Sequence, residues 1–168
     1  MHISEIYKSI YNYYGKTTPL LVDCGQLCNG ACCKSDAGEE TGMYLFPGEE
    51  VLFRNNPDFK IVSSEFEYGN KHADILICNG MCDRNQRPLS CRIFPIIPYV
   101  KNNAFELIFD PRAKSICPLL ELRDFSKLDP LFIHKTTKVT RLLLNFAETR
   151  SFLEGISDII DDLLKFGI

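Results

Sequence analysis

Eight cysteines are the residues whose type and spacing point most directly to chemistry, and all of them lie between Cys24 and Cys117. They form two groups of four, Cys24, Cys28, Cys32 and Cys33, and then Cys78, Cys82, Cys91 and Cys117. Four thiolates are the ligand set of a tetrahedral zinc site or of one cubane iron–sulfur cluster. All eight cysteines are therefore candidate metal ligands.

The spacing of the first group limits how it can hold metal. Cys24, Cys28 and Cys32 are four residues apart, so a helical segment would place them on one face. Cys33 would then point about a third of a turn away, and in an extended segment it would face the side opposite Cys32. The adjacent pair is poorly placed to hold one ion. We therefore expect the two groups to interleave, or the pair to bridge two neighbouring sites.

Charge supports the same interpretation. Eight ionised thiols would add eight negative charges to a formal net charge of −3. Without a cation the thiols would stay protonated, since their pKa values are about 8.5 and higher when buried. Arg87 and Arg92 flank Cys91. These arginines neutralise cluster charge, hold an anionic substrate or form ordinary surface ion pairs, and the sequence leaves the three roles open.

Ligand type narrows the choice of metal. An all-sulfur set suits an iron–sulfur cluster or zinc and disfavours magnesium and calcium. The three-residue gaps within the first group differ from the two-residue knuckles of structural zinc sites and from the bacterial ferredoxin pattern. We expect an iron–sulfur cluster or zinc, and we favour iron–sulfur. The alternatives are that the cysteines form four disulfides or are buried free thiols.

Composition bears on compartment and partners. The 168 residues are 45% hydrophobic, which suits one domain over residues 1–168 with its own core. The negative net charge argues against a nucleic-acid partner. The N-terminal residues carry charges where a signal peptide is apolar, and the apolar stretch 93–100 is short and contains two prolines. We expect a cytoplasmic protein with no membrane partner, in which thiols stay reduced.

The elements that must position the cysteines are both helical and extended. Apolar residues at helical spacing predict a helix over residues 3–14 that ends at Gly15. The cysteine-rich segment 23–42 reads as a loop or irregular helix, and Pro47 opens a short helix through residue 53. Strands are predicted at residues 59–66, 74–78, 96–101 and 104–109, the last two joined by Asn102-Asn103.

The last third of the chain predicts a helical pair over residues 129–166. Asp129-Pro130 has the form of an N-cap and first turn, and an apolar stripe follows it. Ser151 to Glu154 has the form of a capping box that opens a second helix. The fold class is therefore α+β: a small cysteine-rich metal-binding body with strands, packed by an N-terminal helix and two C-terminal helices.

The cysteine pattern resembles the CxxCxxCC cysteine-cluster family. The resemblance covers residues 20–120. It rests on the first cysteine block, the pair Cys78 and Cys82, the segment from Arg87 to Pro95, and Cys117-Pro118-Leu119. It implies a zinc- or iron-chelating domain. The three-residue gaps depart from the two in the family's name. Some longer relatives resemble flagellin lysine methylases, but no methyltransferase domain is evident, so that activity is not carried over.

Two functions stay open at this point. The first is a metal-binding protein with one or two cysteine-ligated sites, which acts as a structural module, a carrier, or an accessory module for a protein-modification enzyme. The second is a redox or transferase enzyme that uses a cysteine-ligated iron–sulfur cluster. The sequence has no Walker motif, dinucleotide fingerprint or nucleophile elbow, so no catalytic residue is named. A concave pocket beside the metal would favour the enzyme.

Overall fold

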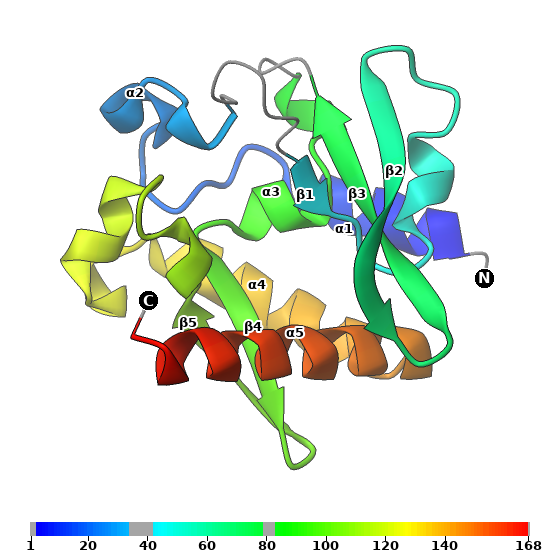
Figure 1. The fold of residues 1–168 in the computed structure, drawn as a ribbon. Helices are drawn as coiled ribbons and strands as arrows, with labels where there is room; N and C mark the ends of the chain where they lie inside the picture. Colours follow the sequence, from blue (N-terminus) through cyan, green and yellow to red (C-terminus); the bar gives the residue numbers. More distant parts are fainter. Residues whose placement is uncertain (1–2, 34–41, 79–82, 168) are drawn as a thin grey trace.

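The computed structural model describes residues 3–33, 42–78 and 83–167, and their fold is α+β, as predicted (Figure 1). The α-helices in these residues are α1 (Ile3–Tyr14), α2 (Gly25–Cys28), α3 (Leu89–Ile93), α4 (Pro130–Leu143) and α5 (Ala147–Lys165). The strands are β1 (Gly42–Tyr44), β2 (Phe59–Tyr68), β3 (Lys71–Cys78), β4 (Ile96–Lys101) and β5 (Ala104–Phe109). The predicted N-terminal helix is confirmed at both ends.

β3 is the central strand of an antiparallel sheet with β1 and β2 on its two sides. Both β2 and β3 extend beyond their predicted bounds, and the turn between them is at Gly69, where φ is 57°. An irregularity between Ser63 and Glu67 shifts the pairing, and the strands then pair again as far as Tyr68 and Lys71. Because a bulge breaks the two-residue alternation, the sequence pattern understates the length of this hairpin.

The β4–β5 hairpin has the predicted bounds. Asn102 and Asn103 both adopt positive φ, at 50° and 62°, as a two-residue hairpin turn with right-handed strand twist requires. Asparagine tolerates this conformation better than most residues. β4 buries Ile96, Ile97 and Val100. In Figure 1, α5 runs across β4, so this hairpin has a covered face.

The main core joins the three long helices to β4 and to the sheet. Tyr7 of α1, Phe132 of α4 and Phe152 of α5 are each at most 2% exposed. Phe152 makes edge-on contacts with Tyr44 and Tyr68, whose ring centroids lie 6.5 and 5.4 Å from its own. None of the described cysteines belongs to this core, and Cys117 instead forms a separate small buried cluster with Ala113 and Leu119.

One helix start differs from the prediction. α5 begins at Ala147, so Ser151 lies inside the helix and does not cap it. Two tertiary features accompany this earlier start. Thr149 is buried in the first turns of α5, and the Arg150 guanidinium donates a hydrogen bond to the Leu144 carbonyl over 2.7 Å. The capping-box pattern of the sequence is a local match that these tertiary contacts override.

The start of α4 agrees with the prediction and can be tested. The Asp129 carboxylate accepts a hydrogen bond from the Leu131 N–H over 2.9 Å. We expect Asp129→Ala to lower the free energy of unfolding by about 1 kcal/mol in urea titrations. Asp129→Asn is the matched control, because an amide oxygen caps about as well, and it should stay within a few tenths of a kcal/mol. Equal losses in both variants would contradict a capping role.

Candidate metal centre

The first cysteine group lies on a short helix and the turn after it. Cys24 caps the N-terminus of α2 and Cys28 is its last residue. Asn29 and Gly30 then have φ values of 50° and 68°, which end the helix. Cys32 lies in the 3₁₀ turn that follows, Ala31–Cys33. The first three cysteines therefore do not share one helix, although the chain turns back so that they face the same space.

Two polar side chains, Thr18 and Asp23, fix the segment that leads into this group. The buried Thr18 hydroxyl lies 2.7 Å from the Leu20 carbonyl oxygen and 2.9 Å from that of Val22. The Asp23 carboxylate accepts from the Gly25 N–H over 3.0 Å and forms an ion pair with Arg84. Arg84 belongs to the loop before α3, so this ion pair joins the first cysteine group to the segment that carries Cys91.

Cys91 lies in the middle of α3, and its neighbours hold that helix in place. The buried Arg92 donates from Nε to the Arg87 carbonyl and from Nη2 to the Asn85 carbonyl, both over 2.8 Å. Its guanidinium carbon lies 4.2 Å from the centre of the Tyr11 ring. Arg92 therefore serves as an internal brace, which removes it from the surface ion-pair role that the sequence left open.

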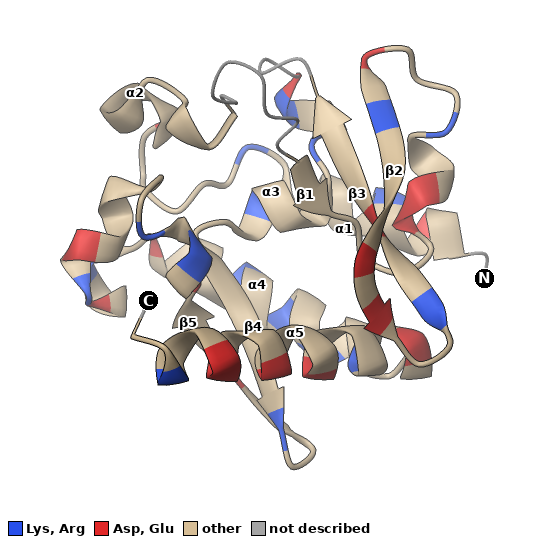
Figure 2. Cartoon of the chain, viewed as in Figure 1, with Lys and Arg blue, Asp and Glu red and all other residues tan. Residues whose placement is uncertain are grey.

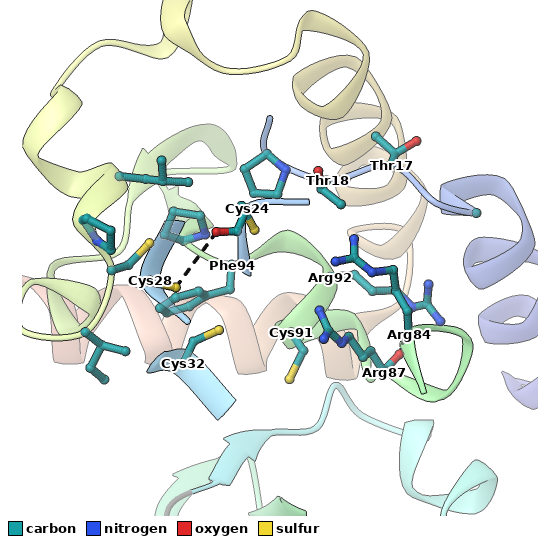
Figure 3. A pocket seen from close by; sticks show the side chains of 17 residues that line it. Thr17, Thr18, Cys24, Cys28, Cys32, Arg84, Arg87, Cys91, Arg92 and Phe94 are labelled. Carbon is teal, nitrogen blue, oxygen red and sulfur yellow. Dashed lines mark hydrogen bonds between the residues drawn. The ribbon is translucent and has the colours of Figure 1, made fainter. Parts of the chain in front are cut away.

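Five cysteines from both groups line one small cavity of about 50 Å³ (Figure 3). They are Cys24, Cys28, Cys32, Cys91 and Cys117. In the close-up, Cys24, Cys28 and Cys32 lie on one side of Cys91, and Arg84, Arg87 and Arg92 lie on the other. The fold thus brings together cysteines that are far apart in the sequence.

A second cavity of about 120 Å³ adjoins the first and is lined by Cys32, Cys33, Cys78 and Cys91. Cys32 and Cys91 line both cavities. The expected interleaving of the two groups is therefore present in the residues that the structure describes. Cys82 lies outside the described residues. No disulfide joins the other seven cysteines to one another.

The donor set fits a sulfur-ligated metal in kind, since cysteines line both cavities. Among the residues that the structure describes, no three His, Cys, Asp or Glu side chains are arranged to hold a metal ion. The sulfur atoms of Cys32 and Cys33 are 4.0 Å apart, and sulfurs on one tetrahedral zinc are separated by about 3.8 Å. Ligation of one ion by more of the thiols therefore requires their sulfur atoms to lie closer together than they do in this structure.

The surroundings of the thiols shift their pKa values in different directions. The pKa of Cys33 is lowered to about 6, chiefly by a hydrogen bond with Cys32 and also by Arg87 and Arg84, although burial opposes the shift. Burial is the main cause that raises the pKa of Cys24 and of Cys117. Acidic positions run along α5, whereas α3 carries a basic one (Figure 2). The cavities therefore combine thiols that are mostly partly buried with nearby cations that favour thiolate.

Glu49 is a residue of this site that sequence reasoning missed. It was expected only as an acidic residue in the first turn of a short helix, which the structure contains as a 3₁₀ turn, Glu49–Leu52. Glu49 is fully buried. Its carboxylate accepts from the Leu89 N–H over 2.6 Å, from the Phe46 N–H over 3.0 Å and from the Tyr11 hydroxyl. An acidic residue within the apolar run LFPGEEVLF is the signal that identifies it.

Comparison of the chain with family models, with curated proteins and with solved structures gave no match. The family resemblance of the cysteine pattern therefore rests on the residues themselves. Within the described residues, no helix has both the length and the apolar composition that a bilayer crossing requires. The site must be interpreted from its own geometry and chemistry.

The titration of Glu49 gives a testable pH dependence. Burial raises the pKa of Glu49 to about 7 from an ordinary value of 4.5, although its hydrogen bonds and Arg92 oppose the shift. The folded protein then binds more protons than the unfolded chain between these two values, so stability falls as the pH rises from about 4.5 to about 7. Glutamine does not titrate, so over this pH range we expect the free energy of unfolding of Glu49→Gln to fall by about 3 kcal/mol less than that of the wild type.

The measurement is urea unfolding of both proteins at intervals from acidic to neutral pH, in one buffer system. Glu50→Gln is the control, because that neighbouring carboxylate is partly exposed and pairs with Arg54 at 3.3 Å. The control should keep the wild-type pH dependence. A Glu49→Gln protein whose stability follows the wild-type curve would show that Glu49 stays ionised throughout.

Proposed function

We propose that this chain is a metal-binding protein that holds an iron–sulfur cluster or zinc through its cysteines. The observation that carries the proposal is the meeting of seven cysteines, from two groups distant in sequence, around two adjoining cavities. Metal ligation gives a physical reason for this convergence, because a bound cation stabilises thiolates that would otherwise be costly to bury.

The arrangement favours one extended centre or two neighbouring centres over isolated sites. Cys24, Cys28 and Cys117 line only the smaller cavity, and Cys33 and Cys78 line only the larger one. Cys32 and Cys91 line both and are the natural bridging or shared ligands. Cys82 follows the end of β3 in sequence and completes the set of eight proposed ligands.

The arginines beside the site support an anionic centre. Sulfur-rich clusters carry net negative charge, and nearby guanidinium groups stabilise it. Arg84, Arg87 and Arg92 all line the smaller cavity. The similarity to the CxxCxxCC cysteine-cluster family points the same way, and reduced thiols agree with a cytoplasmic location.

A second candidate function is a redox or transferase enzyme that uses the cluster in its reaction. One observation favours it: a larger cavity of about 240 Å³ shares Phe94 and Ile116 with both cysteine-lined cavities. A purely structural metal site needs no such neighbour. The role as an accessory module for a modification enzyme has no comparable support in the geometry.

Metal content tests the proposal directly. We expect anaerobically purified protein to contain stoichiometric metal. Iron with acid-labile sulfide and visible absorption would identify a cluster, and colourless protein with zinc would identify a zinc site. Chelation should lower the melting temperature, because metal-binding free energy contributes to folding. Metal-free protein with four disulfides and unchanged stability would refute the proposal.

A single substitution separates ligation from packing. We expect Cys91→Ser to lower metal per chain and melting temperature together, because a neutral hydroxyl is a poor replacement for thiolate. Ala73→Ser is the matched control: Ala73 is 1% exposed on β3, outside both cysteine cavities. The control should lose about 1–3 kcal/mol of stability and keep its metal. Full metal occupancy in Cys91→Ser would exclude Cys91 as a ligand.

A further inference from the structure

A third cavity lies between β1, α3, β4 and α5. Its volume is about 240 Å³. Aromatic residues form one part of its wall, including Tyr44, Phe46 and Phe152, and isoleucines such as Ile97 and Ile156 form another. A wall of this kind selects for apolar surface.

This cavity shares part of its wall with the cysteine-lined cavities. Phe94 and Ile116 line it and both cysteine-lined cavities. Ser90, which lines the apolar cavity, directly precedes Cys91 on α3. Cys117 directly follows Ile116. A molecule bound here would lie one side chain away from two proposed ligands.

The size of the cavity exceeds what packing defects leave. Protein interiors hold few voids larger than one water molecule. An apolar cavity of ~150 Å³ is large enough to bind benzene. A space of about 240 Å³ therefore accepts a compound with two fused rings or an equivalent aliphatic group.

One polar pair gives the cavity a defined end. Asp110 and Arg112 both line it, and they form a forked ion pair with Nε to Oδ1 at 2.9 Å and Nη2 to Oδ2 at 2.7 Å. Asp110 is 5% exposed. The carboxylate repels an anionic ligand and the guanidinium repels a cationic one. A neutral hydroxyl suits both, since it donates to Asp110 and accepts from Arg112.

We infer that this cavity is a binding site for a small, mainly apolar molecule that carries a neutral hydroxyl group, held beside the cysteine centre. The inference that a ligand binds in this cavity depends only on the residues that line it. Its use as a substrate site rests on the proposed metal-binding function. The two are tested on the same preparation so that either can fail alone.

The experiment uses 2-naphthol as the probe and the protein as purified. The chain contains no tryptophan, so naphthol fluorescence can be followed without indole emission. We expect saturable one-to-one binding. The anion 2-naphthoate should bind about tenfold more weakly or worse, because it would bring a second buried carboxylate to Asp110. This comparison needs no variant, and equal affinities would overturn the assignment of the polar end.

The second part of the experiment fills the cavity with larger side chains. Ile156→Phe adds volume from α5 and Ile97→Phe adds it from β4, and each should weaken 2-naphthol binding by about tenfold or more. Ile159→Phe, on the same helix but outside this cavity, is the matched control and should bind as the wild type does. Circular dichroism verifies that each variant is folded.

The outcomes separate the two proposals. Absence of 2-naphthol binding, or binding that folded filling variants leave unchanged, would overturn the pocket, whatever the metal content. Protein that binds 2-naphthol in this cavity but contains no metal would retain the pocket and remove the metal-binding function. Metal, selective 2-naphthol binding and its loss in the filling variants together would support a substrate site next to the cysteine centre.

Discussion

The buried carboxylate of Glu49 is the interaction on which the geometry of the cysteine site depends. It accepts hydrogen bonds from Tyr11 of α1, from Phe46 after β1 and from Leu89 at the start of α3. Three segments that are remote in sequence thus meet at one side chain. Leu89 precedes Cys91 by two residues, so the same contact sets where that thiol lies. Burying a carboxyl group is costly, and the three donors offset that cost.

The cysteines are arranged on a scaffold that has its own core. The large apolar cluster consists mainly of helix and strand residues, and none of the described cysteines belongs to it. A metal at this place would order the loops that carry Cys24 to Cys33 more than it would order the long helices. This differs from small zinc domains, in which the metal replaces a core. A cysteine site that is separate from the apolar core suits a centre that exchanges metal or electrons, because the loops around the site can rearrange while the core stays intact.

The position of the apolar cavity decides how the cysteine centre is best understood. Phe94 and Ile116 belong to the walls of all three cavities. If Cys91 and Cys117 bind metal as proposed, a change in their ligation would act directly beside Ser90 and Ile116, which line the apolar cavity. The Asp110–Arg112 pair, in turn, limits what that side accepts. A metal centre with a selective neighbouring pocket has the components of a reactive site, whereas a carrier needs only the sulfur atoms.

The sequence by itself determined the donor chemistry and the local elements. Eight cysteines defined an all-sulfur set, apolar periodicity defined α1, and the Asn102-Asn103 turn and the Asp129 cap defined the ends of β4, β5 and α4. These features depend on residues close together in the chain. Only the tertiary structure decided which cysteines share a cavity, where α5 begins, that Glu49 is buried, and that an apolar space adjoins the site. Each of these depends on contacts between distant segments, and no local pattern records which partner a side chain meets once the core has formed.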